Sequence, residues 1–230
     1  MNTDKRTQVR SHPERASYDK DTYHRIVDDA IFGHLSIVRD AWPHVVPMMV
    51  VRIDDEVLVH CRTETELAAD LRSGRSAALA ITNIRGIVFA KSVRFHSMNY
   101  DSLVVHGAPR LVCNLDEKRD MFVSLLNKIW PGRASVVRQP SEPELRSVDV
   151  FAFDFSNCAA KVRQGGPVQE YDKNVGDTLS NEIWAGWADL ELSVTRFHHT
   201  PYGDRDASES QKPKLPEDGT ETRTLWKERS

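Results

Sequence analysis

Three short β-type segments follow one another between residues 34 and 61, and they constrain the fold more than any other part of the sequence. Turn-forming residues separate them, at Asp40–Pro43 and at Asp54–Asp55. The middle segment is apolar on both faces, which predicts a strand buried on both sides, as in a closed or partly closed β-barrel. The segments are His34–Arg39, His44–Ile53 and Glu56–Cys61.

A proline, Pro47, lies inside the middle segment. Because proline has no N–H to give to a ladder, this residue predicts that the strand lies at a sheet edge or is bulged there. An interrupted ladder leaves backbone N–H and C=O groups that can meet a ligand.

Helical periodicity is the second local signal. The first predicted helix, Asp19–Phe32, has one apolar face, an aspartate that can cap its start, and Gly33 as the residue that ends it. The second, Thr63–Ser73, begins with the capping-box pattern of Thr63 and Glu66. The other two are Asp116–Trp130, which has an apolar stripe typical of core packing, and the short segment Glu142–Leu145.

Strands outnumber helices in this prediction. About seven β-type segments against a few helices favour a mainly β fold, a barrel with helices packed outside, over a doubly wound α/β fold. The remaining predicted strands are Ala77–Asn83, Gly86–Ser92, Ser102–Leu111 and Val148–Phe155, and Ser156–Arg163 continues the last of these as strand until Gly165-Gly166-Pro167 ends it.

An unusual polar segment, Val93–Asp101, lies between two of these strands. It carries His96, Ser97, Asn99 and Tyr100 within five positions. Ordinary hairpin loops prefer Gly, Asn, Asp and Pro for backbone reasons. An imidazole, hydroxyl groups and an amide in this place indicate a ligand site, and the alternative is a solvated surface hairpin.

A predicted strand runs into a predicted helix at Cys61–Thr65. Free amide groups and the helix dipole make such a junction able to hold a phosphate, although most junctions of this kind bind nothing.

Composition excludes several classes. The net charge of −3 and the pI near 6.3 argue against nucleic-acid binding, which usually leaves a basic footprint. No apolar run approaches the roughly 20 residues that cross a bilayer, and the N-terminus has no apolar signal core. Cys61, Cys113 and Cys158 lack paired spacing, which favours buried thiols over a disulfide or a metal site. We therefore expect a cytoplasmic protein with no membrane or nucleic-acid partner.

Several motifs in order resemble one known family. The chain is similar to the pyridoxamine 5′-phosphate oxidase-like superfamily of FMN-binding split β-barrels, and most of all to its flavin-nucleotide-binding branch, which includes nitroimidazole-resistance reductases. The likeness covers about residues 12–190. It rests on HPERASYD, WPHVVPMMVV, EVLVHC, AKSVRFHSMNY with the following VVHG, KVRQGGP and IWAGW.

The resemblance implies a Greek-key-like split barrel that forms a homodimer with two FMN sites at the subunit interface. The isoalloxazine ring would lie against the Val46–Val50 strand, and the junction at His60–Leu67 would hold the phosphate. The segment Lys91–Tyr100 and strand Ser102–Val105 would add ring and ribityl contacts. The implied cofactor-binding residues are Val46, Pro47, Met48, Met49, His60, Arg62, Thr63, Thr65, Lys91, Ser92, Ser97, Tyr100, Ser102 and Trp184.

Some of these residues have a second interpretation. Thr63 and Thr65 can cap a helix as well as bind phosphate. His96 is the candidate catalytic residue, because an imidazole can transfer a proton near neutral pH, and its alternative is a structural role. Arg163 is expected to meet an anionic group or an acidic neighbour. Glu66 and Asp101 are acidic where the resembled family usually has a basic residue.

The resemblance predicts an FMN-dependent oxidoreductase that acts on a small organic substrate in a cleft at the dimer interface. The alternatives are a non-catalytic protein that binds flavin or haem, and a split barrel that has lost its flavin. A deazaflavin, haem or no cofactor at all are the alternatives to FMN, and no metal site is predicted.

Three regions follow from the pattern. Residues 1–17 are expected to form a polar arm, residues 18–195 the flavin-binding barrel domain, and residues 196–230 a disordered tail rich in Pro, Gly, Ser, Thr and charge.

Overall fold

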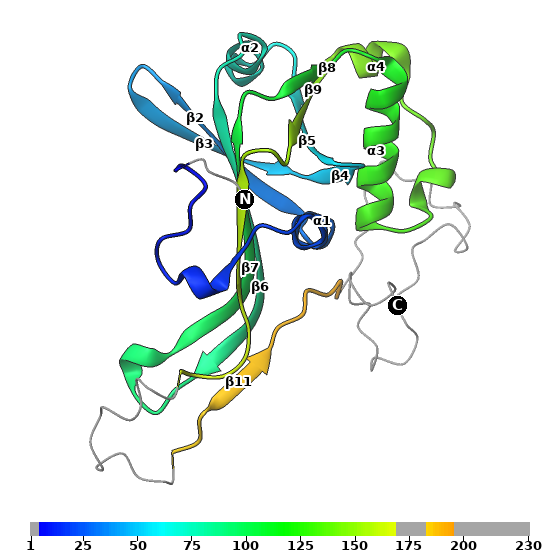
Figure 1. Ribbon diagram of the computed structural model, residues 1–230. Coiled ribbons are helices and arrows are strands. Elements are labelled where there is room, and N and C mark those ends of the chain that lie inside the picture. The colour runs from blue at the N-terminus through cyan, green and yellow to red at the C-terminus, as the bar shows by residue number, and fades with distance from the viewer. Residues whose placement is uncertain (1–4, 169–182, 196–230) are drawn as a thin grey trace.

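The computed structural model describes residues 5–168 and 183–195, which form two antiparallel sheets with helices around them (Figure 1). The larger sheet has the strand order β1-β10-β7-β6-β2-β3, with β11 paired to β6, and the smaller has the order β4-β5-β9-β8. The strands are β1 (Ala16–Ser17), β2 (Phe32–Arg39), β3 (Trp42–Met49), β4 (Val51–Ile53), β5 (Glu56–Arg62), β6 (Ala77–Phe89), β7 (Ser97–Gly107), β8 (Arg110–Val112), β9 (Val148–Asp154), β10 (Cys158–Arg163) and β11 (Gly186–Asp189). The helices are α1 (Lys20–Asp29), α2 (Glu66–Arg72), α3 (Leu115–Ile129) and α4 (Glu142–Arg146).

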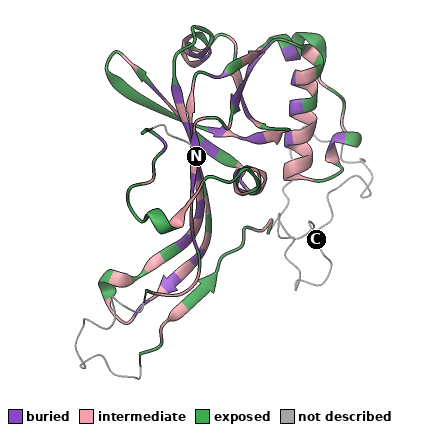
Figure 2. Ribbon diagram, viewed as in Figure 1, coloured by how far each residue is buried: buried purple, intermediate pink, exposed green. Residues whose placement is uncertain are grey.

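The main hydrophobic core lies between the two sheets. It contains Leu35, Leu79, Leu103 and Phe151, all fully buried. A second cluster, which includes Met121 of α3, lies between α3 and the smaller sheet. Figure 2 shows the buried residues gathered where the sheets meet, with the β2–β3 hairpin mainly exposed. The predicted fold class, a mainly β split barrel with helices outside, is confirmed.

The first helix begins where it was predicted, because the Asp19 side chain accepts a hydrogen bond from the Thr22 N–H. It ends at Asp29, however, and the prediction that Gly33 ends it was wrong. Gly33 lies in β2 and is buried, and a Cβ there would come within 3.0 Å of Leu79 Cδ1 and Val50 Cγ1. The glycine therefore serves close packing of the sheet.

Strand β3 is the last strand of the larger sheet, as its proline predicted. The prediction that it is buried on both faces was wrong for the single chain, because its first six residues are exposed. The predicted strand His44–Ile53 is two strands, since the chain leaves the larger sheet at Val50 and enters the smaller one as β4. The preceding turn places Asp40 and Ala41 at φ 51° and 64°, which gives the tight β2–β3 hairpin.

The β6–β7 hairpin is longer than the sequence indicated. Strand β6 joins two predicted strands into one, with a bulge between Ile84 and Gly86. Strand β7 begins at Ser97, so half of the predicted polar loop is strand. The chain then crosses to the smaller sheet at Gly107 and continues as β8, with Pro109 in the crossing. The predicted single strand Ser102–Leu111 was therefore wrong.

Two further expectations need correction. Helix α2 begins at Glu66 and is capped by Thr65, not by Thr63, whose hydroxyl donates to Asp149 Oδ1 at 3.3 Å. The predicted strand Ser156–Arg163 begins only at Cys158, after a turn that moves the chain to the larger sheet. The helices predicted at Asp116–Trp130 and Glu142–Leu145 are confirmed as α3 and α4. The predicted tail, 196–230, lies outside the described residues.

Candidate functional site

A cavity of about 770 Å³ lies between β3, β5 and the start of α2, and we name it the β3 cavity. Its size is within the range of about 300–1,000 Å³ that is usual for ligand pockets. Six of the predicted cofactor contacts line it, namely Val46, Pro47, Met48, Met49, His60 and Thr65. Other lining residues are Phe32, Ile37, Arg39, His44, Cys61, Glu64, Glu66 and Leu67.

The wall formed by β3 offers both apolar side chains and backbone groups. Within the described residues, β3 pairs only with β2, in a register that sets Pro47 opposite His34. An edge strand keeps a row of N–H and C=O groups unpaired. A flat heterocycle lying in the cavity can therefore stack on the apolar side chains while its nitrogen and oxygen atoms meet the backbone.

His60 supplies the least satisfied polar group of the cavity wall. Its ring packs edge-on against Phe122, with 5.1 Å between ring centroids, and its buried Nδ1 has no hydrogen-bond partner among the described residues. Burial lowers the pKa of His60, so the imidazole is neutral at neutral pH. A ligand atom that reaches Nδ1 would remove the cost of this unpaired group.

The junction at the start of α2 has balanced charges. The Thr65 hydroxyl donates to the Arg62 carbonyl at 2.8 Å and accepts from the Ala68 N–H, so it caps the helix. Arg39 binds Glu66 and also donates to Asp70 at 2.8 Å. The acidic Glu66, unexpected next to a phosphate, is therefore neutralised from β2. Arg62 and Thr63 do not line the cavity; the Arg62 side chain is exposed and forms an ion pair with Glu64.

The other predicted contacts lie at the far end of the larger sheet, around the β6–β7 hairpin (Figure 1). The Phe89 ring contacts the His96 ring edge-on at 6.1 Å between centroids, and it contacts the Trp184 ring at 5.6 Å. His96 Nδ1 lies 3.1 Å from the Ser92 carbonyl oxygen. The residues of this end, which we name the hairpin end, are Lys91, Ser92, His96, Ser97, Tyr100 and Trp184. Ser102 lies midway along β7, opposite Thr82, and none of these seven predicted residues lines the β3 cavity.

Asp101 has a structural role in this chain. It is only 1% exposed and binds Arg25 at 2.6 Å and Arg85 at 2.8 Å, which ties α1, β6 and β7 together. Its negative charge is therefore compensated inside the protein and does not face the β3 cavity.

Arg163 is also buried, and it meets neutral groups. Its guanidinium donates to Asn99 Oδ1 and to the carbonyls of Gly165 and Gly166. The expectation of an acidic protein neighbour is not met in the hydrogen bonds of the described residues. Burial lowers the pKa of Arg163, and Arg15 nearby adds to this effect.

A family profile described as pyridoxamine 5′-phosphate oxidase matches residues 19–162, which is more than half of the chain. The chain belongs to this family. A search of curated protein sequences finds no match. The family match spans α1 to β10 and so includes the whole β3 cavity.

Solved structures share the fold of this family member. The flavocytochrome Anf3 from Azotobacter vinelandii is 23% identical with a TM-score of 0.77, over 94% of this chain and 95% of that one. An FAD and haem binding protein from Mycobacterium smegmatis is 24% identical with a TM-score of 0.72, over 84% and 93%. A candidate 5-nitroimidazole antibiotic resistance protein from Bacteroides thetaiotaomicron is 20% identical with a TM-score of 0.51, over 64% and 86%.

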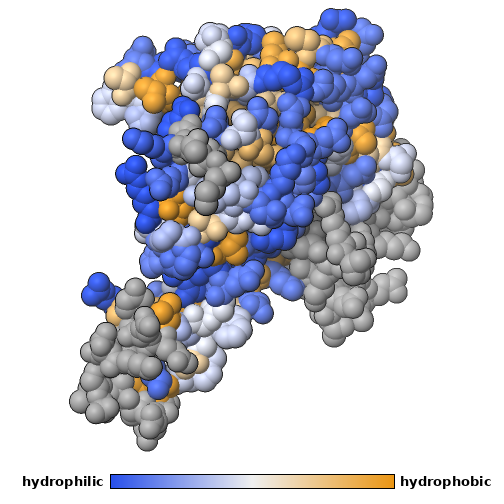
Figure 3. Space-filling model, viewed as in Figure 1, coloured by the Kyte–Doolittle hydropathy of each residue, from blue (hydrophilic) through white to orange (hydrophobic). Residues whose placement is uncertain are grey.

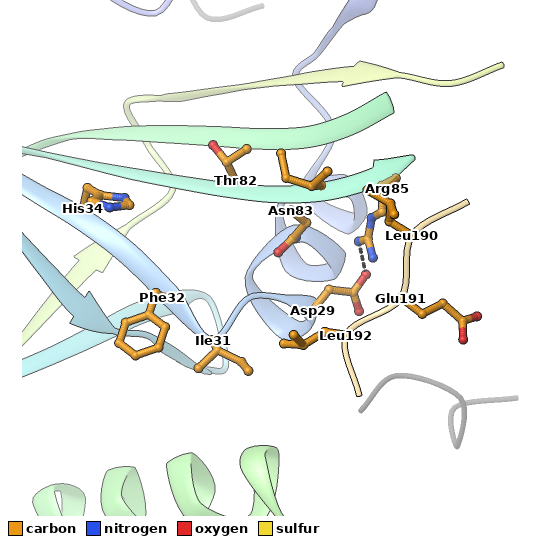
Figure 4. A pocket seen from close by; sticks show the side chains of 11 residues that line it. Asp29, Ile31, Phe32, His34, Thr82, Asn83, Arg85, Leu190, Glu191 and Leu192 are labelled. Carbon is orange, nitrogen blue, oxygen red and sulfur yellow. Dashed lines mark hydrogen bonds and ion pairs between the residues drawn. The ribbon is translucent and has the colours of Figure 1, made fainter. Parts of the chain in front are cut away.

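A second cavity, of about 570 Å³, lies across β2 from the first, and we name it the β6 cavity (Figure 4). It was not predicted. Phe32 lines both cavities, and His34 lines the second. The alternation of Phe32 and His34 with the buried Gly33 and Leu35 is the sequence signal that would have placed both side chains on one outer face.

Among the described residues no cluster of metal-ligating side chains is present, and no helix is long and apolar enough to cross a membrane.

The sequence did not predict that Arg39, His44 and Cys61 line the β3 cavity. Burial raises the pKa of the Cys61 thiol, which keeps it protonated and poorly nucleophilic.

Proposed function

We propose that this chain binds a flavin in the β3 cavity, with FMN as the preferred flavin, and acts as an oxidoreductase on a small organic molecule. The observation that carries the proposal is that a member of the pyridoxamine 5′-phosphate oxidase family gathers six predicted cofactor contacts around one cavity. The names of two full-length fold relatives, a flavocytochrome and an FAD and haem binding protein, support a flavin as the ligand class.

The residues of the cavity fit such a ligand. Val46, Met48 and Met49 offer an apolar wall for a ring, and the free edge of β3 offers backbone groups for its heteroatoms. His60 offers an unpaired nitrogen. A bound flavin supplies reversible two-electron chemistry, and the protein holds it, excludes water and positions the substrate.

We also propose that the active unit is a homodimer. Large apolar side chains are exposed on the β2–β3 hairpin, with Trp42 73%, Val45 58% and Phe32 54% accessible. Figure 3 shows apolar side chains on this hairpin, at the upper left of the view. Exposed patches of this kind mark interfaces. A second chain that covers the β2–β3 hairpin of the first would also bring its own hairpin end, at the β6–β7 hairpin, to the β3 cavity of the first chain.

The dimer explains why the predicted contacts form two separate groups in one chain. Cavity residues lie at one end of the larger sheet, and Lys91, His96 and Trp184 lie at the other. A two-fold axis places such ends next to each other in an isologous pair. Under this proposal His96 approaches the flavin of the partner subunit.

The purified protein tests the proposal directly. We expect flavin absorbance, or uptake of added FMN to about one flavin per chain, and mass spectrometry of the released cofactor separates FMN from FAD. A colourless protein that takes up neither flavin would contradict the proposal. Reduction of the bound flavin by NADH or NADPH, followed by reoxidation with an organic acceptor, would then support an enzyme over a carrier.

A second candidate function, binding of flavin and haem together, is favoured by one observation. The two structures that align over 94% and 84% of this chain are the flavocytochrome and the FAD and haem binding protein. Histidines that can ligate iron line both cavities, with His44 and His60 in the first and His34 in the second. Titration with hemin separates the candidates, because ligation by histidine shifts the Soret band and simple adsorption does not.

A further inference from the structure

The β6 cavity exists because one edge of β6 is only partly paired. Strand β2 pairs with β6 as far as Ile81, and β11 takes the same edge from Gly86 onward. Residues 82–85 border the gap between the two partners. The chain after β11, Leu190–Leu192, closes the far side, as Figure 4 shows.

The walls of the cavity are apolar and incompletely covered. Ile84, Leu190 and Leu192 remain about half exposed, as does Phe32 at the other end. Such side chains gain free energy when a ligand removes them from water. Aliphatic side chains around one aromatic ring suit a flat aromatic ligand, which can lie between them and stack on Phe32.

The charges of the cavity disfavour an anionic ligand. Arg85 is the single guanidinium or ammonium group among the described lining residues, and it is held by two carboxylates, Asp29 and Asp101, the latter at 2.8 Å. Figure 4 shows the ion pair between Arg85 and Asp29 at one end of the cavity. Glu191 also borders the cavity, but its carboxylate points away from it in Figure 4. A ligand that carries a carboxylate or a sulfonate would find no uncommitted cation there.

Two polar side chains can orient an uncharged ligand. His34 of β2 and Thr82 of β6 line the cavity away from the ion pair, and neither side chain hydrogen bonds to another described residue. The Asn83 amide, by contrast, is used, because it donates to the Ile26 carbonyl at 2.9 Å. An imidazole and a hydroxyl together can donate to a carbonyl or nitro oxygen at the edge of a ring.

We propose that the β6 cavity binds an uncharged, flat aromatic compound that has a hydrogen-bonding oxygen or nitrogen at its edge. Phe32 separates this compound from the β3 cavity, since its side chain lines both. The assignment of this compound as the substrate of the flavin site rests on the function proposed above, whereas its binding does not.

A matched pair of probes tests the binding. We expect 1,4-naphthoquinone to bind the purified protein in calorimetric titration, and 1,4-naphthoquinone-2-sulfonate to bind at least about tenfold more weakly because of the carboxylates. His34→Leu should weaken naphthoquinone about fivefold, the effect of one hydrogen bond. The control His106→Leu removes a histidine of β7 that does not line the cavity, and it should change nothing.

A second variant guards against a merely structural effect of His34. Ile84→Glu adds a carboxylate to an exposed wall residue, so it should abolish naphthoquinone binding while the unfolding transition stays unchanged. Equal binding of the two probes, no binding of either, or binding that Ile84→Glu leaves unchanged would overturn the inference. A hemin Soret shift that His34→Leu removes would also overturn it, because a dianionic macrocycle would then occupy the cavity.

Flavin affinity, measured separately in each variant, keeps the two proposals distinct. Failure to bind flavin overturns the proposed function and leaves naphthoquinone binding to be judged on its own. A flavin bound and reduced as proposed above would supply two electrons and two protons to the two oxygens of naphthoquinone, which would give the hydroquinone and oxidised flavin. Slower reoxidation in His34→Leu, with unchanged flavin affinity, is the expected result.

Discussion

The two cavities on either side of β2 share one side chain, Phe32, and differ in the polar groups that remain for a ligand. Each has an arginine already bound by two carboxylates, Arg39 in the β3 cavity and Arg85 in the β6 cavity. The β3 cavity adds the free edge of a strand and the buried His60 nitrogen, which has no partner among the described residues. The β3 cavity therefore suits a ligand with many heteroatoms, and the β6 cavity suits a ligand with few.

The ion cluster beside the β6 cavity gives the largest expected effect. Asp101→Ala removes the buried carboxylate that Arg25 and Arg85 share, while Arg85 keeps its ion pair with Asp29. We expect a loss of about 3 kcal/mol in the free energy of unfolding, measured by urea denaturation, because two charge-assisted hydrogen bonds are lost together. Asp55→Ala removes an exposed carboxylate that binds Lys20 and serves as the control. Equal stability of the two variants would mean that Asp101 does not hold this side of the sheet together.

The C-terminal wall of the β6 cavity depends on a glycine. A Cβ at Gly86 would lie 2.6 Å from the Ala188 carbonyl oxygen, so Gly86→Ala should push β11 away from β6. We expect a cost of about 1–3 kcal/mol for the clash and faster amide hydrogen exchange at residues 186–189. At Gly166 a Cβ would make an ordinary contact of 3.4 Å with Trp187, so Gly166→Ala is the control. An unchanged rate of amide exchange in Gly86→Ala would mean that β11 does not pack closely against Gly86 and does not form this wall of the cavity.

A negative charge introduced at the start of α2 tests whether the phosphate of FMN lies at that end of the β3 cavity. Thr65→Asp keeps a good capping residue and adds a negative charge beside the predicted phosphate. We expect FMN affinity, measured by flavin fluorescence, to fall about tenfold from Coulomb repulsion near the surface. Asn114→Asp makes the same kind of change at the cap of α3 and should leave affinity unchanged. If both variants bind FMN as the natural chain does, the phosphate lies elsewhere.

How much of the fold and of the candidate site could be predicted from the sequence differs from residue to residue. The edge position of β3 followed from Pro47, and the start of α1 from Asp19, because each acts through the backbone alone. The exposed face of β3 was not predictable from its apolar residues, since these residue types are the same ones that fill a buried strand. The ion cluster of Asp101 brings together residues 25, 85 and 101, and no local pattern reports such distant pairing.

The smallest effect is a pH dependence that comes from His60 in the β3 cavity. Burial lowers the pKa of folded His60 below the value of about 6.5 that an unfolded histidine has. Below that pH the unfolded chain binds the extra proton, so stability is fully present above about pH 6.5 and declines as the pH falls toward the folded pKa. His60→Gln should flatten the profile of unfolding free energy below about pH 6.5. A profile that is identical in His60→Gln would contradict the burial of a neutral imidazole.

The most direct test of the central claim, that a flavin lies between the β3 cavity of one subunit and the hairpin end of the other, is complementation. Thr65→Asp damages the first half of the site and Trp184→Ala the second, so each homodimer should bind FMN weakly. If the halves come from different subunits, mixing the two variants under exchange restores full affinity in about a quarter of the sites, since half of the dimers are mixed and each holds one intact site. Flavin fluorescence titration of the mixture measures that fraction. No recovery on mixing, with mixed dimers shown to form, would place the whole site within one chain and contradict the account.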